Sequence, residues 1–185
     1  MNVQSKLPTT PEEFLRWNEG REGKREFVDG KVVEMIINVT RIHLLLATRL
    51  THQLVEQLGT ADYVIGSADF GVRTPDGVRF PDVLIERTGG DWKALATSEP
   101  LLVAEILSPS SIADDFGPKA RDYLAIPSLQ HYLVLSQDEP CLWLWSRQGD
   151  EWRGPELFRD RTEPVFLPGL DVQLDPAALY AGIAN

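Results

Sequence analysis

The sequence predicts an α/β domain, in which helices pack against a β-sheet. Residues 101–107, LLVAEIL, form a short apolar run that is typical of a strand buried on both faces. Residues 40–58 repeat apolar side chains at a spacing of three to four, which indicates a helix that packs on the sheet. Residues 25–37 alternate on either side of Asp29-Gly30, which predicts an antiparallel hairpin.

Composition fits a single globular domain over residues 1–185, because 43% hydrophobic content in a chain of 185 residues is enough to form a core. The net charge of −10 argues against constitutive tight binding to DNA, so a nucleic-acid role would need a local basic patch or a metal ion. No signal-peptide pattern or membrane-length apolar stretch is present, so we expect a cytoplasmic protein with no membrane partner. The single cysteine, Cys141, lies in the apolar run CLWLW and is interpreted as a buried thiol.

The N-terminal residues predict a short helix ahead of the hairpin. Thr10 suits the N-cap, Pro11 the first helical position and Glu13 a capping box. This helix should turn three apolar side chains inward, those of Phe14, Leu15 and Trp17. In the hairpin, Glu26 lies on the same face as Val28, and the pattern leaves open whether Glu26 is an exposed strand residue or a functional one.

The helix of residues 40–58 should end at Gly59 and turn His43 toward the sheet with the leucines of the same face. In that position His43 is interpreted as a histidine at the edge of the core rather than as a catalytic residue. With His52 and His131 it shows no metal-ligand spacing such as HExxH, which argues against a zinc hydrolase.

Strand-like patterns follow at residues 63–66, 71–73 and 78–86. Two Pro-Asp pairs occur in this region. Asp76 is followed by glycine in a segment with turn chemistry and is interpreted as a turn residue, whereas Asp82 is followed by Val-Leu-Ile. Of these two aspartates, only Asp82 lies in a position that suits a metal ligand.

Glu105 is the one polar residue in the strand of residues 101–107. In alternating strand geometry it shares a face with Leu101, Val103 and Leu107, so its carboxylate should be removed from water. A lone buried charge is costly, and such a glutamate therefore needs a partner, a proton or a metal ion.

A helix should follow this strand, beginning at residue 114 or 115 and ending before residue 127, because Pro118 is tolerated only in a first turn. Asp115, Lys119 and Tyr123 then lie on one side of it. Lys119 is either half of an ordinary Asp-Lys helix pair or a functional lysine, and its position one short loop after Glu105 favours the functional role.

The rest of the chain is interpreted as scaffold. We expect strands at residues 131–135 and 141–145, an edge segment at 165–174 and a closing helix from Asp175-Pro176. Three tryptophans are assigned to core or dimer-interface packing rather than to base stacking, namely Trp143, Trp145 and Trp152.

Several motifs carry a family resemblance: REFVDGKVVEM, FPDVLIE, LLVAEILSPSS, D-x3-K-x3-Y and LPGLDVQLDPAALY. In this order and at these intervals, they resemble the Uma-two family of restriction-endonuclease-like proteins, over about Thr9 to Tyr180. The resemblance implies a restriction-endonuclease-like mixed β-sheet flanked by α-helices, with additional antiparallel hairpins. It also implies a Mg²⁺-dependent PD-(D/E)XK-type site, for which Mn²⁺ is a plausible substitute, and a homodimer.

Carried over position by position, the resemblance makes Asp82 and Glu105 the metal-binding acids, Glu26 the accessory acid and Lys119 the displaced lysine. The backbone carbonyl of Ile106 would complete the protein ligands of a hard cation, which prefers oxygen. The chain departs from the basic superfamily pattern at Leu107, which stands where a lysine is expected.

The expected function is therefore metal-dependent hydrolysis of DNA phosphodiester bonds by an endonuclease. Two alternatives stay open. One is a non-catalytic module that keeps the nuclease fold and recognises nucleic acid or a protein. The other is that Glu105 and Lys119 form a structural ion pair.

Overall fold

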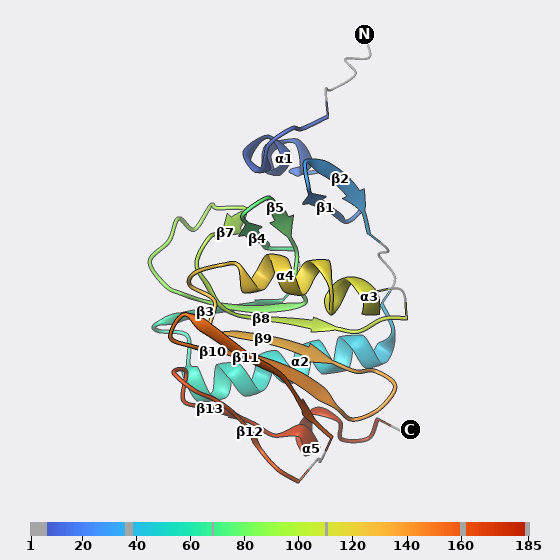
Figure 1. Cartoon of the computed structure of the whole chain (residues 1–185), viewed down its shortest axis with the longest axis vertical. Coiled ribbons are helices and arrows are strands. Elements are labelled where there is room, and N and C mark those ends of the chain that lie inside the picture. Colours follow the sequence, from blue (N-terminus) through green and yellow to red (C-terminus); the bar gives the residue numbers. More distant parts are fainter. Residues whose placement is uncertain (1–6, 36–38, 68, 110, 160–161, 184–185) are drawn as a thin grey trace.

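The computed structural model describes residues 7–35, 39–67, 69–109, 111–159 and 162–183, and its centre is a six-stranded sheet (Figure 1). The strand order is β11-β10-β9-β8-β6-β3. Strands β8 and β9 are parallel and the other neighbours are antiparallel, so the predicted mixed sheet is confirmed. The six strands are β3 (Tyr63–Ser67), β6 (Val83–Arg87), β8 (Pro100–Ile106), β9 (His131–Leu135), β10 (Leu142–Gln148) and β11 (Glu151–Phe158).

A second sheet with the order β2-β1-β5-β4-β7 lies above the first in Figure 1, capped by helix α1 (Pro11–Asn18). Its strands are β1 (Arg25–Val28), β2 (Lys31–Glu34), β4 (Gly71–Thr74), β5 (Gly77–Arg79) and β7 (Ala96–Thr97). Phe14 and Leu15 of α1 are buried against Phe27 and Val78, as the capped amphipathic pattern predicts. The hairpin turn at Asp29-Gly30 is also confirmed.

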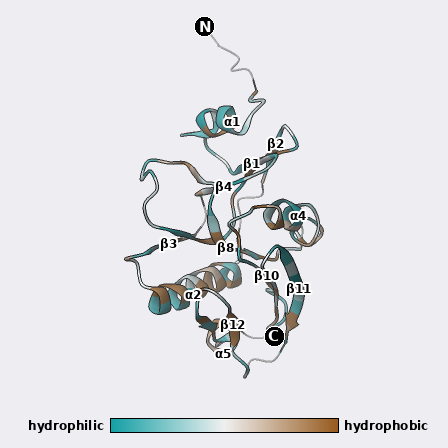
Figure 2. Ribbon diagram, turned by 60° about the vertical axis from the view of Figure 1, so that its left-hand side comes forward, coloured by the Kyte–Doolittle hydropathy of each residue, from teal (hydrophilic) through white to brown (hydrophobic). Residues whose placement is uncertain are grey.

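Helices cover both faces of the six-stranded sheet. The long helix α2 (Arg41–Leu58) lies on one face and has both hydrophobic and hydrophilic positions along its length (Figure 2). It begins at the Thr40 cap and ends at Gly59, as the sequence predicts. Two short helices, α3 (Ile112–Asp115) and α4 (Pro118–Leu124), form the connection between the parallel strands β8 and β9 on the opposite face.

Alternation along β8 separates two apolar cores. Leu102, Ala104 and Ile106 pack with α2, whereas Val103 and Leu107 pack with α4. Glu105 therefore points to the α4 side, on the face that was expected. Leu101 differs from this expectation, because it joins the α2 core at the irregular start of the pairing between β6 and β8.

The C-terminal part closes the α2 core. Strands β12 (Val165–Leu167) and β13 (Val172–Leu174) form a hairpin within the predicted edge segment, and α5 (Pro176–Leu179) follows its Asp175 cap. Cys141 is buried, as expected. None of the helices in the described ranges is both long and apolar enough to cross a bilayer.

Two of the predicted elements have wrong bounds. The run of residues 78–86 is two strands in different sheets, separated at residues 80–82. The single helix expected from residue 114 or 115 is divided between α3 and α4, because Gly117 interrupts it and Pro118 starts the second helix. Strands β7 and β11 were not predicted.

The tryptophans of β10 and β11 pack within the domain. Trp145 is buried and its ring lies 5.1 Å from that of Tyr132, while Trp143 packs edge-on against Phe116 at 5.0 Å. Trp152 donates its indole N–H to the carbonyl of Leu124. These contacts agree with the interpretation of the three residues as packing residues.

Candidate active site

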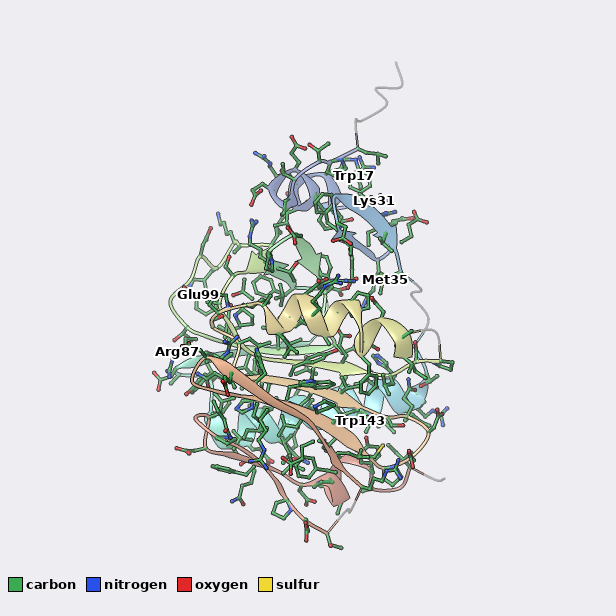
Figure 3. The ribbon with its side chains drawn as sticks, viewed as in Figure 1. Trp17, Lys31, Met35, Arg87, Glu99 and Trp143 are labelled. Carbon is green, nitrogen blue, oxygen red and sulfur yellow. The ribbon has the colours of Figure 1, made fainter. Side chains whose placement is uncertain are left out.

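A cavity of about 270 Å³ opens where the two sheets meet, and it is lined by every residue of the predicted site. Glu26 comes from β1, Asp82 from the segment just before β6, Glu105 and Ile106 from the end of β8, and Lys119 from the first turn of α4. Met35, labelled in Figure 3, lies just after β2 and also lines the cavity. The structure thus brings together residues that are up to 93 positions apart in the sequence, the separation of Glu26 and Lys119.

Asp82 is held just before the start of β6, at one end of the strands of the large sheet. Its backbone N–H donates to the carbonyl of Ala104 at 3.1 Å, which anchors it to β8 before β6 begins. Its side-chain Oδ2 accepts from the backbone N–H of Ile106 at 2.8 Å and lies 3.1 Å from His43 Nε2. The side chain remains 18% exposed, so its carboxylate is open to the cavity.

Glu105 is buried and its two oxygens have different partners. Oε1 accepts from the Tyr123 hydroxyl at 2.8 Å, and Oε2 lies 3.2 Å from Lys119 Nζ. Both partners come from α4, which covers this face of the sheet. Burial raises the pKa of Glu105 well above its ordinary value; Lys119 offsets part of this, while the Asp82 carboxylate raises the pKa further.

Lys119 is surrounded by carboxylates. Besides Glu105, its ammonium lies 3.3 Å from Asp115 Oδ1 and 4.0 Å from Glu26 Oε1. Burial alone would lower the pKa of Lys119, but the carboxylates of Glu105, Glu26 and Asp115 outweigh burial and raise it. The amine is therefore a permanent cation at neutral pH.

Asp115 is as deeply buried as its partner, with 1% of its side chain exposed. Burial raises the pKa of its carboxyl, and Lys119 opposes that shift. One lysine thus pairs with several acids, and it therefore does not fully offset the rise in pKa that burial causes at Glu105 and Asp115.

Glu26 is fixed by a second buried cation, Arg79. Arg79 donates to Glu26 Oε2 at 2.7 Å, and the backbone N–H of Phe80 donates to Oε1 at 3.2 Å. The other guanidinium contacts are with Asp122 of α4, at 2.7 Å, and Asp114 of α3, at 3.4 Å. Arg79 therefore connects the small sheet to the crossover helices, and Glu26 is an inward-facing residue rather than an exposed one.

Among the residues in or beside the site, four were not assigned to it from the sequence: His43, Arg79, Asp115 and Tyr123. His43 does lie at the edge of the core, as interpreted, but it also contacts Asp82 and lines the cavity. The one feature of the sequence that indicated a place in the site was the position of His43 on the sheet-facing side of a helix. Arg79 carried no such signal, because its partners are distant in the sequence.

The donors of the cavity fit a hard divalent cation. Asp82 Oδ1 has no hydrogen-bond or ion-pair partner among the residues that the structure describes, and Glu105 and the Ile106 backbone lie in the same lining. Within those same ranges, no group of three or more His, Cys, Asp or Glu residues is arranged to hold a metal. Mg²⁺ commonly takes one or two carboxylates and keeps several waters, so two acids and a carbonyl are sufficient.

Comparisons with known proteins agree with this architecture. The model of the Uma2 family, described as "Putative restriction endonuclease", matches residues 11–177. Two uncharacterized proteins of Synechocystis sp., slr1290 and sll1609, are 32% and 29% identical to the chain. The first alignment covers 95% of this chain and 93% of the relative, and the second covers 85% and 92%.

A solved structure shares the fold. It is the crystal structure of an Anabaena variabilis protein described as "a putative nuclease belonging to DUF820", with a TM-score of 0.76 and 17% identity. The match covers 96% of this chain and 100% of that one, so the expected restriction-endonuclease-like fold is confirmed. Since the family model spans most of the sequence, the chain belongs to the Uma2 family.

Proposed function

We propose that the chain is a metal-dependent endonuclease that hydrolyses DNA phosphodiester bonds. The observation that carries the proposal is the convergence of Glu26, Asp82, Glu105 and Lys119 on one cavity. Membership of a family described as "Putative restriction endonuclease" supports the same reaction class.

Asp82, Glu105 and the carbonyl of Ile106 would hold Mg²⁺, or Mn²⁺ in its place. When bound, such a cation lowers the pKa of a water ligand and neutralises charge on a phosphoryl oxygen. Because burial raises the pKa of Glu105, protons compete more strongly with a cation for this carboxylate, and binding should strengthen as the pH rises.

Lys119 supplies a fixed positive charge beside Glu105. Because its pKa is raised, it cannot act as a base at neutral pH, and its role is to orient Glu105 and to offset negative charge that develops on the phosphate. Glu26, held on both oxygens by Arg79 and Phe80, lies 4.0 Å from Lys119 and would help to position its ammonium.

Two further cations at the cavity suit an anionic substrate. Lys24 and Arg25 precede Glu26 and line the cavity. The Arg25 guanidinium donates to the carbonyls of Glu22 and Gly23, whereas Lys24 lies 3.7 Å from the exposed Asp69 and would be the residue that contacts a phosphate of the nucleic-acid backbone.

The experiment is to titrate the purified chain with Mn²⁺ by calorimetry and to incubate it with single-stranded and duplex DNA. We expect one or two Mn²⁺ per chain, cleavage that EDTA abolishes, and loss of both binding and cleavage in Asp82→Ala and Glu105→Ala. Asp76→Ala is the matched control, because this aspartate also follows a proline but lies exposed in the β4–β5 turn. Cleavage at the wild-type rate by either site variant would refute the proposal.

A second candidate is a non-catalytic module that recognises nucleic acid or protein. It is favoured by one observation: both oxygens of Glu105 and the amine of Lys119 are satisfied within the protein. This candidate predicts that Asp82→Asn, which removes a proposed metal ligand at a partly exposed position, leaves DNA or partner binding unchanged. Mn²⁺-dependent cleavage by the wild type would exclude it.

A further inference from the structure

The imidazole of His43 lines the cavity from α2, whereas Lys119 comes from α4 on the other face of the sheet. His43 is the third residue of that helix, and its backbone N–H donates to the Thr40 hydroxyl at 3.1 Å, so the N-cap fixes the backbone of this residue. The ring is 14% exposed, and its Nε2 lies 3.1 Å from Asp82 Oδ2.

The hydrogen bonds of Asp82 are unevenly distributed between its two oxygens. Oδ2 accepts from the Ile106 N–H at 2.8 Å and also contacts His43. Because a carboxylate oxygen only accepts, Nε2 is the donor in this contact. Oδ1, in contrast, has no partner within the described part of the chain. One oxygen is thus held against the protein and the other is left for a ligand in the cavity.

We propose that His43 is a positioning residue for Asp82: it fixes Oδ2 so that Oδ1 is presented to the metal ion. This inference rests on the proposed function, in which Asp82 is a metal ligand. Without His43, one hydrogen bond from Ile106 would hold a carboxylate whose terminal torsion is soft, and the two oxygens could exchange places. Residues that orient a metal ligand in this way commonly change metal affinity by about 10–100-fold.

The same helix offers a matched control. His52 also places Nε2 near a carboxylate oxygen, Glu56 Oε1, at 3.2 Å. That pair is solvent-exposed, with 69% and 62% of the two side chains accessible, and it lies outside the cavity lining. Removing His52 therefore deletes a His-carboxylate contact from α2 without affecting Asp82.

The test measures Mn²⁺ affinity by calorimetry in the full-length wild type and in three variants. We expect affinity to fall by about 10–100-fold in His43→Ala and to be unchanged in His52→Ala. His43→Gln should restore most of the affinity, because its amide nitrogen can donate to Oδ2 from nearly the same distance along the side chain. A purely structural role for His43 would not give this rescue in folded variants.

A measurement on the wild type separates positioning from direct ligation. Pulsed electron paramagnetic resonance of bound Mn²⁺ should show no coordinated nitrogen, and a directly bound ¹⁴N would overturn the positioning role. Equal Mn²⁺ affinity of wild type and His43→Ala would overturn the inference and leave the proposed function standing. Absence of Mn²⁺ binding by the wild type would overturn both.

Discussion

Lys119→Met is the substitution whose effect the structure defines most closely. The methionine keeps much of the side-chain volume but removes the charge that Glu105, Asp115 and Glu26 share at 3.2, 3.3 and 4.0 Å. Removing one partner of a buried ion pair typically costs about 3–5 kcal/mol, because the other charge is left uncompensated. Domains are stabilised by about 5–15 kcal/mol in total, so this loss should be large but measurable.

The loss should depend on pH in a defined direction. Glu105 and Asp115 have pKa values raised by burial and partly offset by Lys119, so without the lysine both pKa values rise further. An acid whose pKa is higher in the folded than in the unfolded state stabilises the fold while it is protonated. Its contribution to the free energy of unfolding is lost as the pH rises from the unfolded pKa through the folded pKa. The destabilisation by Lys119→Met should therefore be larger at pH 8 than at pH 5.

Urea unfolding at the two pH values measures both effects. Lys31→Met is the control, because Lys31 is exposed on the outer hairpin strand β2 (Figure 3) and its replacement should change stability by no more than about 0.5 kcal/mol. A loss below about 1 kcal/mol at pH 8, or a larger loss at pH 5 than at pH 8, would refute the reasoning that three carboxylates depend on this amine.

Three other predictions use the same unfolding assay. Arg79→Met should cost about 3–5 kcal/mol because Glu26 stays buried without its cation, whereas Arg73→Met, at the more exposed pair with Glu12, should cost under about 1 kcal/mol; equal losses would contradict this. Tyr123→Phe removes the donor to Glu105 Oε1 and should cost about 1–3 kcal/mol, and an unchanged midpoint would count against that hydrogen bond. Gly77→Ala would place a Cβ 2.0 Å from the Phe27 carbonyl oxygen and should cost about 3 kcal/mol, the upper end of the usual cost of overpacking, while Gly66→Ala meets nothing within 4 Å. If the two alanines are tolerated equally, the close approach of β1 and β5 is wrong.

Local signals predicted much of the fold. Caps and first-turn prolines located α1 and α5, and alternation around Glu105 gave the buried face of β8. Residues 78–86 were predicted as one strand because their apolar pattern continues through Phe80-Pro81. The division into two strands follows only from pairing, since the first part pairs with β1 and the second with β8. A local sequence pattern does not specify which strands pair with each other in this way.

The site shows the same limit. Asp82 and Glu105 stood out because each is a carboxylate in an apolar strand context. Arg79 did not, since an arginine in a short strand is ordinary, and its acidic partners lie 53, 43 and 35 positions away. His43 was assigned to the correct face, but the sequence does not specify which strand end the first turn of α2 meets.

The link of residues 80–82 has a consequence for how the protein matures. Within three residues the chain leaves the small sheet, donates its Phe80 amide to Glu26 and then anchors Asp82 on β8. The acids are therefore contributed by both sheets, Glu26 by the small one and Asp82 and Glu105 by the large one. A newly synthesised or partly unfolded chain in which the two sheets are not packed together lacks the complete cluster of acids.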